Sequence, residues 1–149
     1  MEVEVNKLSA NERFSFKKLI KLFEEVFKME DFILPSEEYL KKLLAKPDFM
    51  VFIASSEEKI IGGVTVYTLE QYYHTKPLAY IYDLAVSISF QRKGIGRQLI
   101  NAVNNHCREQ GFEEVFVQAD KIDDYAIDFY RKTKPTNEED VSHFYYTLN

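Results

Sequence analysis

Two hydrophobic periods alternate along the chain, one typical of helices and one typical of strands. Apolar residues recur every three or four positions in four segments, which predicts four amphipathic helices. The expected helices span residues 14–27, 36–46, 95–111 and 123–132. Ser36 is expected to cap the second helix, and the segment 9–11 (Ser-Ala-Asn) is expected to cap the first.

Strand-like segments separate and follow these helices. They span residues 3–8, 49–55, 60–69, 78–86, 115–119 and 141–148. A polar turn at 56–59 joins the second and third of them, which predicts an antiparallel hairpin, and Gly62 and Gly63 are expected to mark a bulge. The order of elements predicts an α+β, α/β-layered architecture: a mixed, mostly antiparallel central sheet with helices on both faces.

The predicted strand at 78–86 is apolar or aromatic except for one charged residue, Asp83. Strict alternation places its side chains on two faces. Tyr80, Tyr82, Leu84 and Val86 are expected on one face, and Ile81, Asp83 and Ala85 on the other. An unpaired carboxylate is costly to bury in such a strand, so we expect Asp83 to face a cleft.

Composition narrows the class of protein. With 149 residues and 46% hydrophobic content, the chain suits one globular domain spanning residues 1–149. No apolar run approaches the ~20 residues of a membrane span, and the first residues lack the features of a secretory signal, so we expect a cytoplasmic protein that does not bind membranes. The net charge of −5 makes nucleic acid a poor partner and favours a cationic ligand. The single cysteine, Cys107, excludes a disulfide framework, and we expect no metal.

Candidate chemistry is concentrated in the sequence QRKGIGR at 91–97, where the strand 78–86 leads into the next helix. Amides at a helix N-terminus can hold phosphate oxygens, and the glycines 94 and 96 allow a diphosphate to approach the main chain closely. Positive charge is added there by Arg92, Lys93 and Arg97. The pattern favours a pyrophosphate-binding turn, with an ordinary basic loop as the alternative. The glycine patterns of dinucleotide and nucleoside-triphosphate loops are both absent.

The segment 91–96 resembles the Q/R-x-x-G-x-G/A motif with which N-acetyltransferases of the GNAT superfamily bind acetyl-coenzyme A. The order of elements is similar to that fold over nearly the whole chain. Three further segments resemble the aminoglycoside 3-N-acetyltransferases of the gentamicin-resistance type: YIYDLAV at 80–86, VQAD at 117–120 and EDVSHF at 139–144. The sequence RKTKPTN at 131–137 departs from the family's Lys-Leu-Gly continuation, on the acceptor side of the fold.

The resemblance implies that two parallel strands splay apart and that acetyl-CoA enters the gap like an extra strand. Main-chain groups of the strand would hold the pantetheine arm, and the amides of the following turn would hold the pyrophosphate. The implied acetyl-CoA contacts are Leu84, Ala85, Val86, Gln91, Arg92, Lys93, Gly94, Ile95, Gly96, Arg97, Asp123 and Ala126. Asp123 stands where the family commonly has asparagine.

Two residues are candidates for acid–base chemistry. Acetyl transfer needs a neutral amine, so a base must remove a proton, and an acid can protonate the leaving thiolate. Asp83 is the candidate base, with a substrate-ammonium contact, a solvent-facing position or an ion pair with a lysine as alternatives. Tyr130 is the candidate acid, because a phenol, with a reference pKa of about 10, is still protonated at neutral pH. The alternatives for Tyr130 are aromatic packing and positioning of the sulfur.

Acidic residues are candidates for binding a polycationic acceptor. They are Asp120, Asp124, Glu37 and Asp31. Helix capping or plain surface exposure is the alternative for each of them.

The resulting expectation is an acetyl-CoA-dependent N-acetyltransferase whose acceptor is the 3-amino group of an aminoglycoside. Another small amine, a protein N-terminus, or a non-catalytic acyl-CoA-binding role remain as alternatives. A homodimer is also expected, through pairing of the exposed aromatic strand at 141–148.

Overall fold

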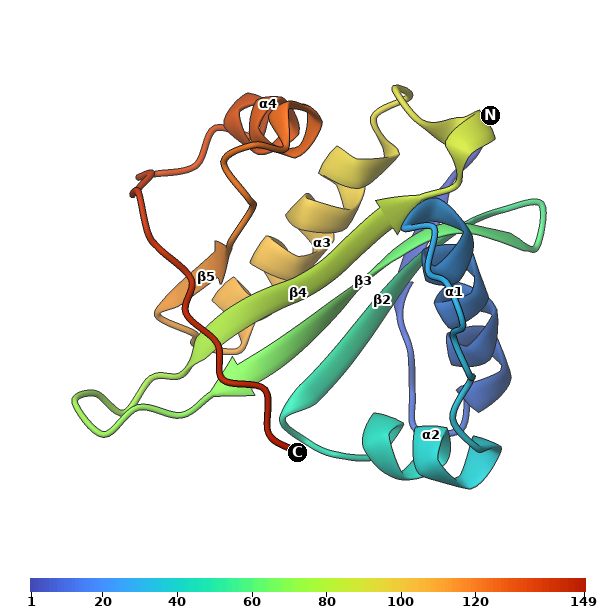
Figure 1. The fold of residues 1–149 in the computed structure, drawn as a ribbon, viewed down its shortest axis with the longest axis horizontal. Helices are drawn as coiled ribbons and strands as arrows, with labels where there is room; N and C mark the ends of the chain where they lie inside the picture. Colours follow the sequence, from blue (N-terminus) through green and yellow to red (C-terminus); the bar gives the residue numbers. More distant parts are fainter. The chain divides into compact units, whose positions relative to one another are not determined.

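The computed structural model describes residues 1–149, which divide into two compact units, residues 1–118 and residues 119–149. The first unit contains a five-stranded sheet and three α-helices (Figure 1). Its strands are β1 (Glu4–Lys7), β2 (Phe49–Ser56), β3 (Lys59–Leu69), β4 (Leu78–Val86) and β5 (Glu114–Val117). Its helices are α1 (Arg13–Val26), α2 (Glu37–Leu44) and α3 (Ile95–Glu109), with a 3₁₀ turn, η1, at Ile88–Phe90. The second unit contains α4 (Asp124–Lys132).

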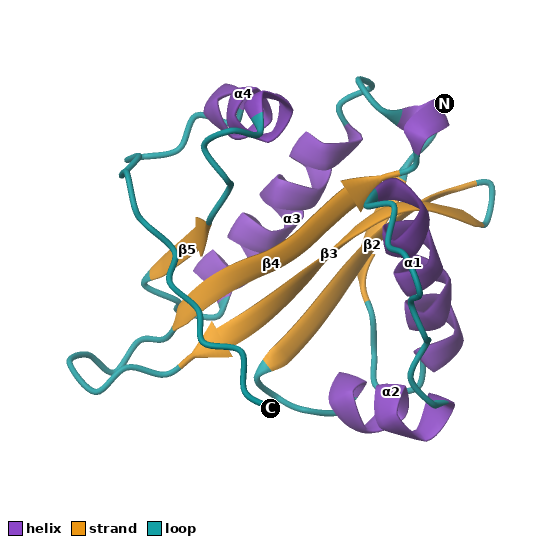
Figure 2. Ribbon diagram, viewed as in Figure 1, coloured by secondary structure: helices purple, strands orange, loops and turns teal.

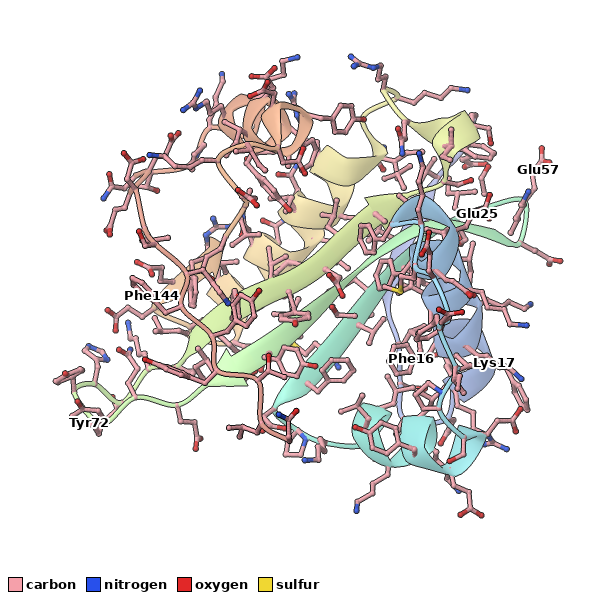
Figure 3. The ribbon with its side chains drawn as sticks, viewed as in Figure 1. Phe16, Lys17, Glu25, Glu57, Tyr72 and Phe144 are labelled. Carbon is pink, nitrogen blue, oxygen red and sulfur yellow. The ribbon has the colours of Figure 1, made fainter.

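The sheet follows the chain in the order β1-β2-β3-β4-β5. The first four strands pair antiparallel, and β5 pairs parallel to β4, with α3 as the crossover between them. The predicted mixed, mostly antiparallel sheet is therefore confirmed. The predicted hairpin is also confirmed: Ser56 pairs with Lys59 across a two-residue turn in which Glu57 and Glu58 have φ of +51° and +64°. Glu57 lies at the tip of that hairpin (Figure 3).

Helices cover both faces of the sheet (Figure 2). On one face α1 packs against β3 so closely that a Cβ on Gly63 would overlap the side chain of Leu19. On the other face α3 packs its apolar stripe, and the ring of Phe52 contacts His106 with centroids 5.6 Å apart. Burial of these two apolar layers is the main driving force for folding of the unit.

Capping interactions determine where the helices begin and end. The Ser36 side chain accepts a hydrogen bond of 3.2 Å from the Tyr39 amide, which confirms the predicted cap of α2. Gly111, with φ of +78°, follows the end of α3 as predicted, and the Phe112 amide donates to the Cys107 carbonyl. The predicted cap at 9–11 is wrong. The N-cap of α1 is Glu12, whose carboxylate accepts instead from the amide and hydroxyl of Ser9.

The expected alternation of side chains along β4 is wrong because the strand carries a bulge. Thr65 pairs with Asp83 and Val66 with Ile81, so Tyr82 is an extra residue. One extra residue reverses the alternation beyond it. Asp83 and Ala85 therefore share the α1 face with Tyr80, whereas Leu84 and Val86 share the α3 face with Ile81. A second bulge, at Ile61 beside Gly62, lies close to the one predicted at Gly62 and Gly63.

The predicted strand at 141–148 is also wrong. The structure has no strand after β5, and Phe144, Tyr145, Tyr146 and Leu148 are 78–90% exposed. Period-2 patterning forms a strand only where a sheet edge accepts its hydrogen bonds, and no such pairing is made here. Within the second unit, two ion pairs lie just before this segment, Lys121–Asp140 at 3.0 Å and Arg131–Glu138 at 2.8 Å.

Candidate active site

The strand β4 has an unpaired edge over its second half. Its parallel pairing with β5 ends at Ile81–Val117, but the strand continues to Val86. The amide of Asp83 donates to the Thr65 hydroxyl at 3.2 Å and the amide of Ser87 donates to the Ile61 carbonyl at 2.7 Å, so both point toward β3. Because successive amides point to opposite sides of a strand, the N–H groups of Leu84 and Val86 point to the open edge.

This open edge can take an extended ligand by adding main-chain hydrogen bonds. The amides of Leu84 and Val86 are the donors that the edge offers, while Ala85 packs its side chain into the α1 core. The Val86 carbonyl already accepts a hydrogen bond of 2.9 Å from Gln91 Nε2. Gln91 therefore ties the turn at 91–97 to the end of β4.

The turn at 91–97 presents a helix N-terminus to solvent. Gly94, with φ of +81°, is the N-cap of α3, and the first intrahelical bond runs from the Gln98 amide to the Gly94 carbonyl at 3.1 Å. The amides before Gln98 have no acceptor within the helix and carry partial positive charge. A Cβ at Gly94 would meet nothing within 4 Å, so the main chain is open to a large ligand there.

Residues around this turn divide into two groups. Ile95 and Gly96 are buried in the first turn of α3. The exposed group is basic and consists of Arg92, Lys93 and Arg97. Arg92 adopts φ of +63°, a left-handed conformation uncommon for a side-chain-bearing residue. Open backbone, amide donors and positive charge together fit a diphosphate.

Asp83 is half-buried on the α1 face, opposite Thr65. Partial burial raises the pKa of the Asp83 carboxyl above its ordinary value, because desolvation penalises the charged form. No lysine or arginine forms an ion pair with it. A carboxylate with these properties is suited to accept a proton or to bind a cation.

A cluster of aromatic rings lies on the same face as Asp83. The Tyr82 ring meets Tyr67 and Tyr80 edge-on, at centroid distances of 5.7 and 6.0 Å. Tyr80 in turn stacks on Phe116 at 4.7 Å. Burial, followed by the neighbouring Tyr82, Tyr39 and Asp83, raises the pKa of Tyr67. Tyr67, Phe116 and Thr65 were not anticipated from the sequence, since aromatic and β-branched residues are ordinary in strands.

The remaining candidates of the first unit are on its surface. Glu37 forms an ion pair of 3.3 Å with Lys17 of α1, and Asp31 is exposed with φ of +54°. Neither is brought into contact with Asp83. Cys107 is buried, as predicted for a core residue, and burial raises the pKa of its thiol to about 11.

The second unit carries the other candidates. Asp123 is the N-cap of α4, and its carboxylate accepts a hydrogen bond of 3.1 Å from the Ala126 amide. The two candidate residues are therefore hydrogen-bonded to each other. Asp120 accepts from the Ile122 amide at 3.2 Å, and Asp124 lies in the first turn of the helix. Tyr130 is half-buried near the end of α4, with its ring 4.9 Å from that of Phe129.

Two broader features concern metals and membranes. No three His, Cys, Asp or Glu side chains gather in a way that would hold a metal ion. None of the helices combines the length and the apolar character needed to cross a bilayer.

The chain is similar in sequence and in fold to known proteins. Residues 16–134 match the family model described as "Acetyltransferase (GNAT) family". The aminoglycoside acetyltransferase meta-AAC0020, from an uncultured soil metagenomic sample and solved in complex with sisomicin, is 58% identical, with a TM-score of 0.98 over 99% of this chain and 97% of that one. A second soil metagenomic aminoglycoside acetyltransferase, HMB0005, is 33% identical, with a TM-score of 0.92 over the full length of both chains.

A human relative is more distant. N-acetyltransferase 8 from Homo sapiens is 26% identical over 91 residues, which cover 61% of this chain but only 40% of that protein. The family match covers most of the present chain, and the two metagenomic enzymes match almost all of it. The chain therefore belongs to the GNAT family of acetyltransferases, enzymes that use acetyl-CoA as the acetyl donor.

Proposed function

We propose that this enzyme transfers the acetyl group of acetyl-CoA to an aminoglycoside, at its 3-amino group. The observation that carries the proposal is the 58% identity, over nearly the whole chain, to an aminoglycoside acetyltransferase solved with sisomicin. The net charge of −5 and the unpaired Asp83 carboxylate suit a polycationic acceptor. The finer assignment, to the 3-amino group, rests on the resemblance of segments 80–86, 117–120 and 139–144 to that enzyme subgroup.

The acetyl donor is held, in this proposal, by main-chain groups. The amides of Leu84 and Val86 bind the pantetheine arm at the open edge of β4, and the amides of the turn at 91–97 bind the diphosphate. Bound there, the thioester supplies an activated acetyl group. The Leu84 amide is also the donor suited to stabilise negative charge that develops on the carbonyl oxygen.

The proton transfers are assigned to two side chains. Asp83 removes a proton from the ammonium of the acceptor, and its raised pKa makes it a stronger base than an ordinary aspartate. Tyr130 donates a proton to the leaving thiolate. Asp31, Glu37, Asp120 and Asp124 contribute to attracting the cationic acceptor.

The direct test is acetylation of sisomicin. Incubation with acetyl-CoA should give a product heavier by one acetyl group, and NMR should locate that group on the 3-amino nitrogen. Sisomicin already acetylated at that nitrogen is the matched control and should not react. If sisomicin does not react while a polyamine or a peptide N-terminus does, the acceptor assignment is wrong. If acetyl-CoA binds and no amine is acetylated, the catalytic proposal is wrong.

A further inference from the structure

We propose that Thr65 is a positioning residue, whose hydroxyl holds the β4 bulge that places Tyr82 and Asp83 together on the α1 face and so orients the Asp83 carboxylate. The inference builds on the proposed role of Asp83 in the reaction. Thr65 itself is buried and does not need to touch either substrate.

The contact that carries this inference is one hydrogen bond at the bulge. Thr65 Oγ1 accepts from the main-chain N–H of Asp83 at 3.2 Å. Thr65 of β3 is also the pairing partner of Asp83 in β4, next to the extra residue Tyr82. A bulge disrupts the regular ladder of main-chain hydrogen bonds. A side-chain acceptor at that point can therefore stabilise the bulged register relative to the regular one.

The chemistry of position 65 supports a specific role for the hydroxyl. Thr65 is 7% exposed and is the only polar residue among the buried residues of the protein. Its neighbours Val64 and Val66 are fully buried. A valine would fill nearly the same volume without the cost of burying a hydroxyl. The hydrogen bond to the Asp83 amide, rather than packing, therefore explains why a hydroxyl is present at position 65.

Loss of this bond has a predictable structural consequence. If the bulge relaxed by one residue, Tyr82 would pair with Thr65 and the Asp83 side chain would turn to the α3 face. That face is lined by fully buried apolar side chains, including Val64 and Val66. A carboxylate would be costly to bury there, so β4 without the hydroxyl would adopt a mixture of strained arrangements.

Three variants test the inference in the full-length enzyme. Thr65→Val removes the hydroxyl and keeps the shape, Thr65→Ser keeps the hydroxyl, and Thr68→Val removes a hydroxyl from the same strand away from the bulge. With the amine that the wild-type enzyme accepts, Thr65→Val should lower kcat roughly 10- to 100-fold, as expected for a misplaced catalytic group. Thr65→Ser should recover most of that loss, and Thr68→Val should behave like the wild type.

A double-mutant cycle separates positioning from a general structural effect. If Thr65 acts through Asp83, Thr65→Val should cause no further loss of kcat in an Asp83→Asn background. Losses that multiply would overturn the inference, as would an unchanged kcat in Thr65→Val.

Amide hydrogen exchange gives a readout that needs no turnover. The Asp83 amide should exchange up to about tenfold faster in Thr65→Val and return to the wild-type rate in Thr65→Ser. The Ser87 amide, bonded to the Ile61 carbonyl, is the internal control and should not change. If no amine is acetylated, the proposed function fails while exchange still decides the role of Thr65. Equal Asp83 exchange in Thr65→Val and wild type overturns that role whatever the acceptor.

Discussion

Gly94 and Gly111 lie at opposite ends of α3 and both have a positive φ, of +81° and +78°. Neither would bring a Cβ within 4 Å of another atom. A side chain at either position therefore causes the same kind of backbone strain and no internal clash. They differ in their surroundings, because only Gly94 belongs to the turn proposed to bind the diphosphate.

This pair gives a matched test of the acetyl-CoA site. Gly94→Ala and Gly111→Ala should each lower the free energy of unfolding by about 1–2 kcal/mol, the cost of left-handed backbone. Only Gly94→Ala should weaken acetyl-CoA binding, by roughly tenfold, because its methyl group occupies the approach of the diphosphate. Isothermal titration calorimetry measures the difference. Equal affinity in the two variants would exclude close approach of the ligand at residue 94.

Asp83→Asn should stabilise the protein at neutral pH. The raised pKa means that folding disfavours the charged carboxylate, a cost that an amide does not have. The folded state then binds more protons than the unfolded state between the two pKa values, so wild-type stability falls as pH rises through that interval. Below the unfolded-state value of about 3.9 both states are protonated and the gain should vanish.

Thermal unfolding of wild type and Asp83→Asn, followed from pH 8 to pH 3, measures this difference. The exposed Asp128 of α4 supplies the control, since Asp128→Asn should shift the midpoint little over the same range. An Asp83→Asn variant that is less stable than wild type at pH 8 would mean that the carboxylate has a stabilising partner.

Tyr130→Phe should lower kcat roughly 10- to 100-fold and leave acetyl-CoA affinity nearly unchanged, because only the proton donor is lost. Tyr146→Phe removes a hydroxyl from a side chain that is 86% exposed and should have no effect. Steady-state kinetics by thiol release, together with titration of acetyl-CoA, separates the two quantities. A kcat equal to wild type would remove Tyr130 from the acid role.

Gly63→Ala should destabilise the fold by about 1–3 kcal/mol, the usual cost of overpacking a core. The new methyl group would overlap Leu19, which is fully buried, and would lie 2.9 Å from the Phe52 carbonyl oxygen. Gly62→Ala is the comparison, because its nearest contact is longer, 3.0 Å to the Ala85 carbonyl oxygen. Chemical denaturation should show the larger loss at residue 63.

The β2–β3 turn should be open to stabilisation. Glu57 and Glu58 both have positive φ, the conformation of a type I′ turn, for which asparagine and glycine are preferred. Replacing them with Asn-Gly should raise the free energy of unfolding by roughly 1–2 kcal/mol. Denaturant titration measures the gain, and reversing the order to Gly-Asn should give less of it.

Sequence periodicity predicted most of the elements because each has a strong local cause. The bounds of β4 were predicted correctly, and the glycine and helix pattern after it placed the start of α3 at Ile95. Ser36 was identified as a cap because its hydroxyl has a defined geometric role at a helix start.

The failures depend on pairing between distant segments, which local patterns do not contain. The bulge at Tyr82 is created by the register between β3 and β4, and it places Asp83 on the face of Tyr80, whereas strict alternation had placed it on the face of Ile81. Thr65 resembles any β-branched strand residue until its bond to the Asp83 amide is seen. The segment 141–148 has strand-like composition but pairs with no sheet edge.

The early end of the β4–β5 pairing at Ile81–Val117 has a consequence for mutagenesis experiments. Backbone amides are the same whatever the side chain, so alanine scanning across Leu84 and Val86 would report lost packing and overlook the donors themselves. Replacing the amide with an ester linkage by semisynthesis would reveal them. The proposed contacts to acetyl-CoA at these two positions therefore depend on the path of the main chain and not on the identity of the side chains.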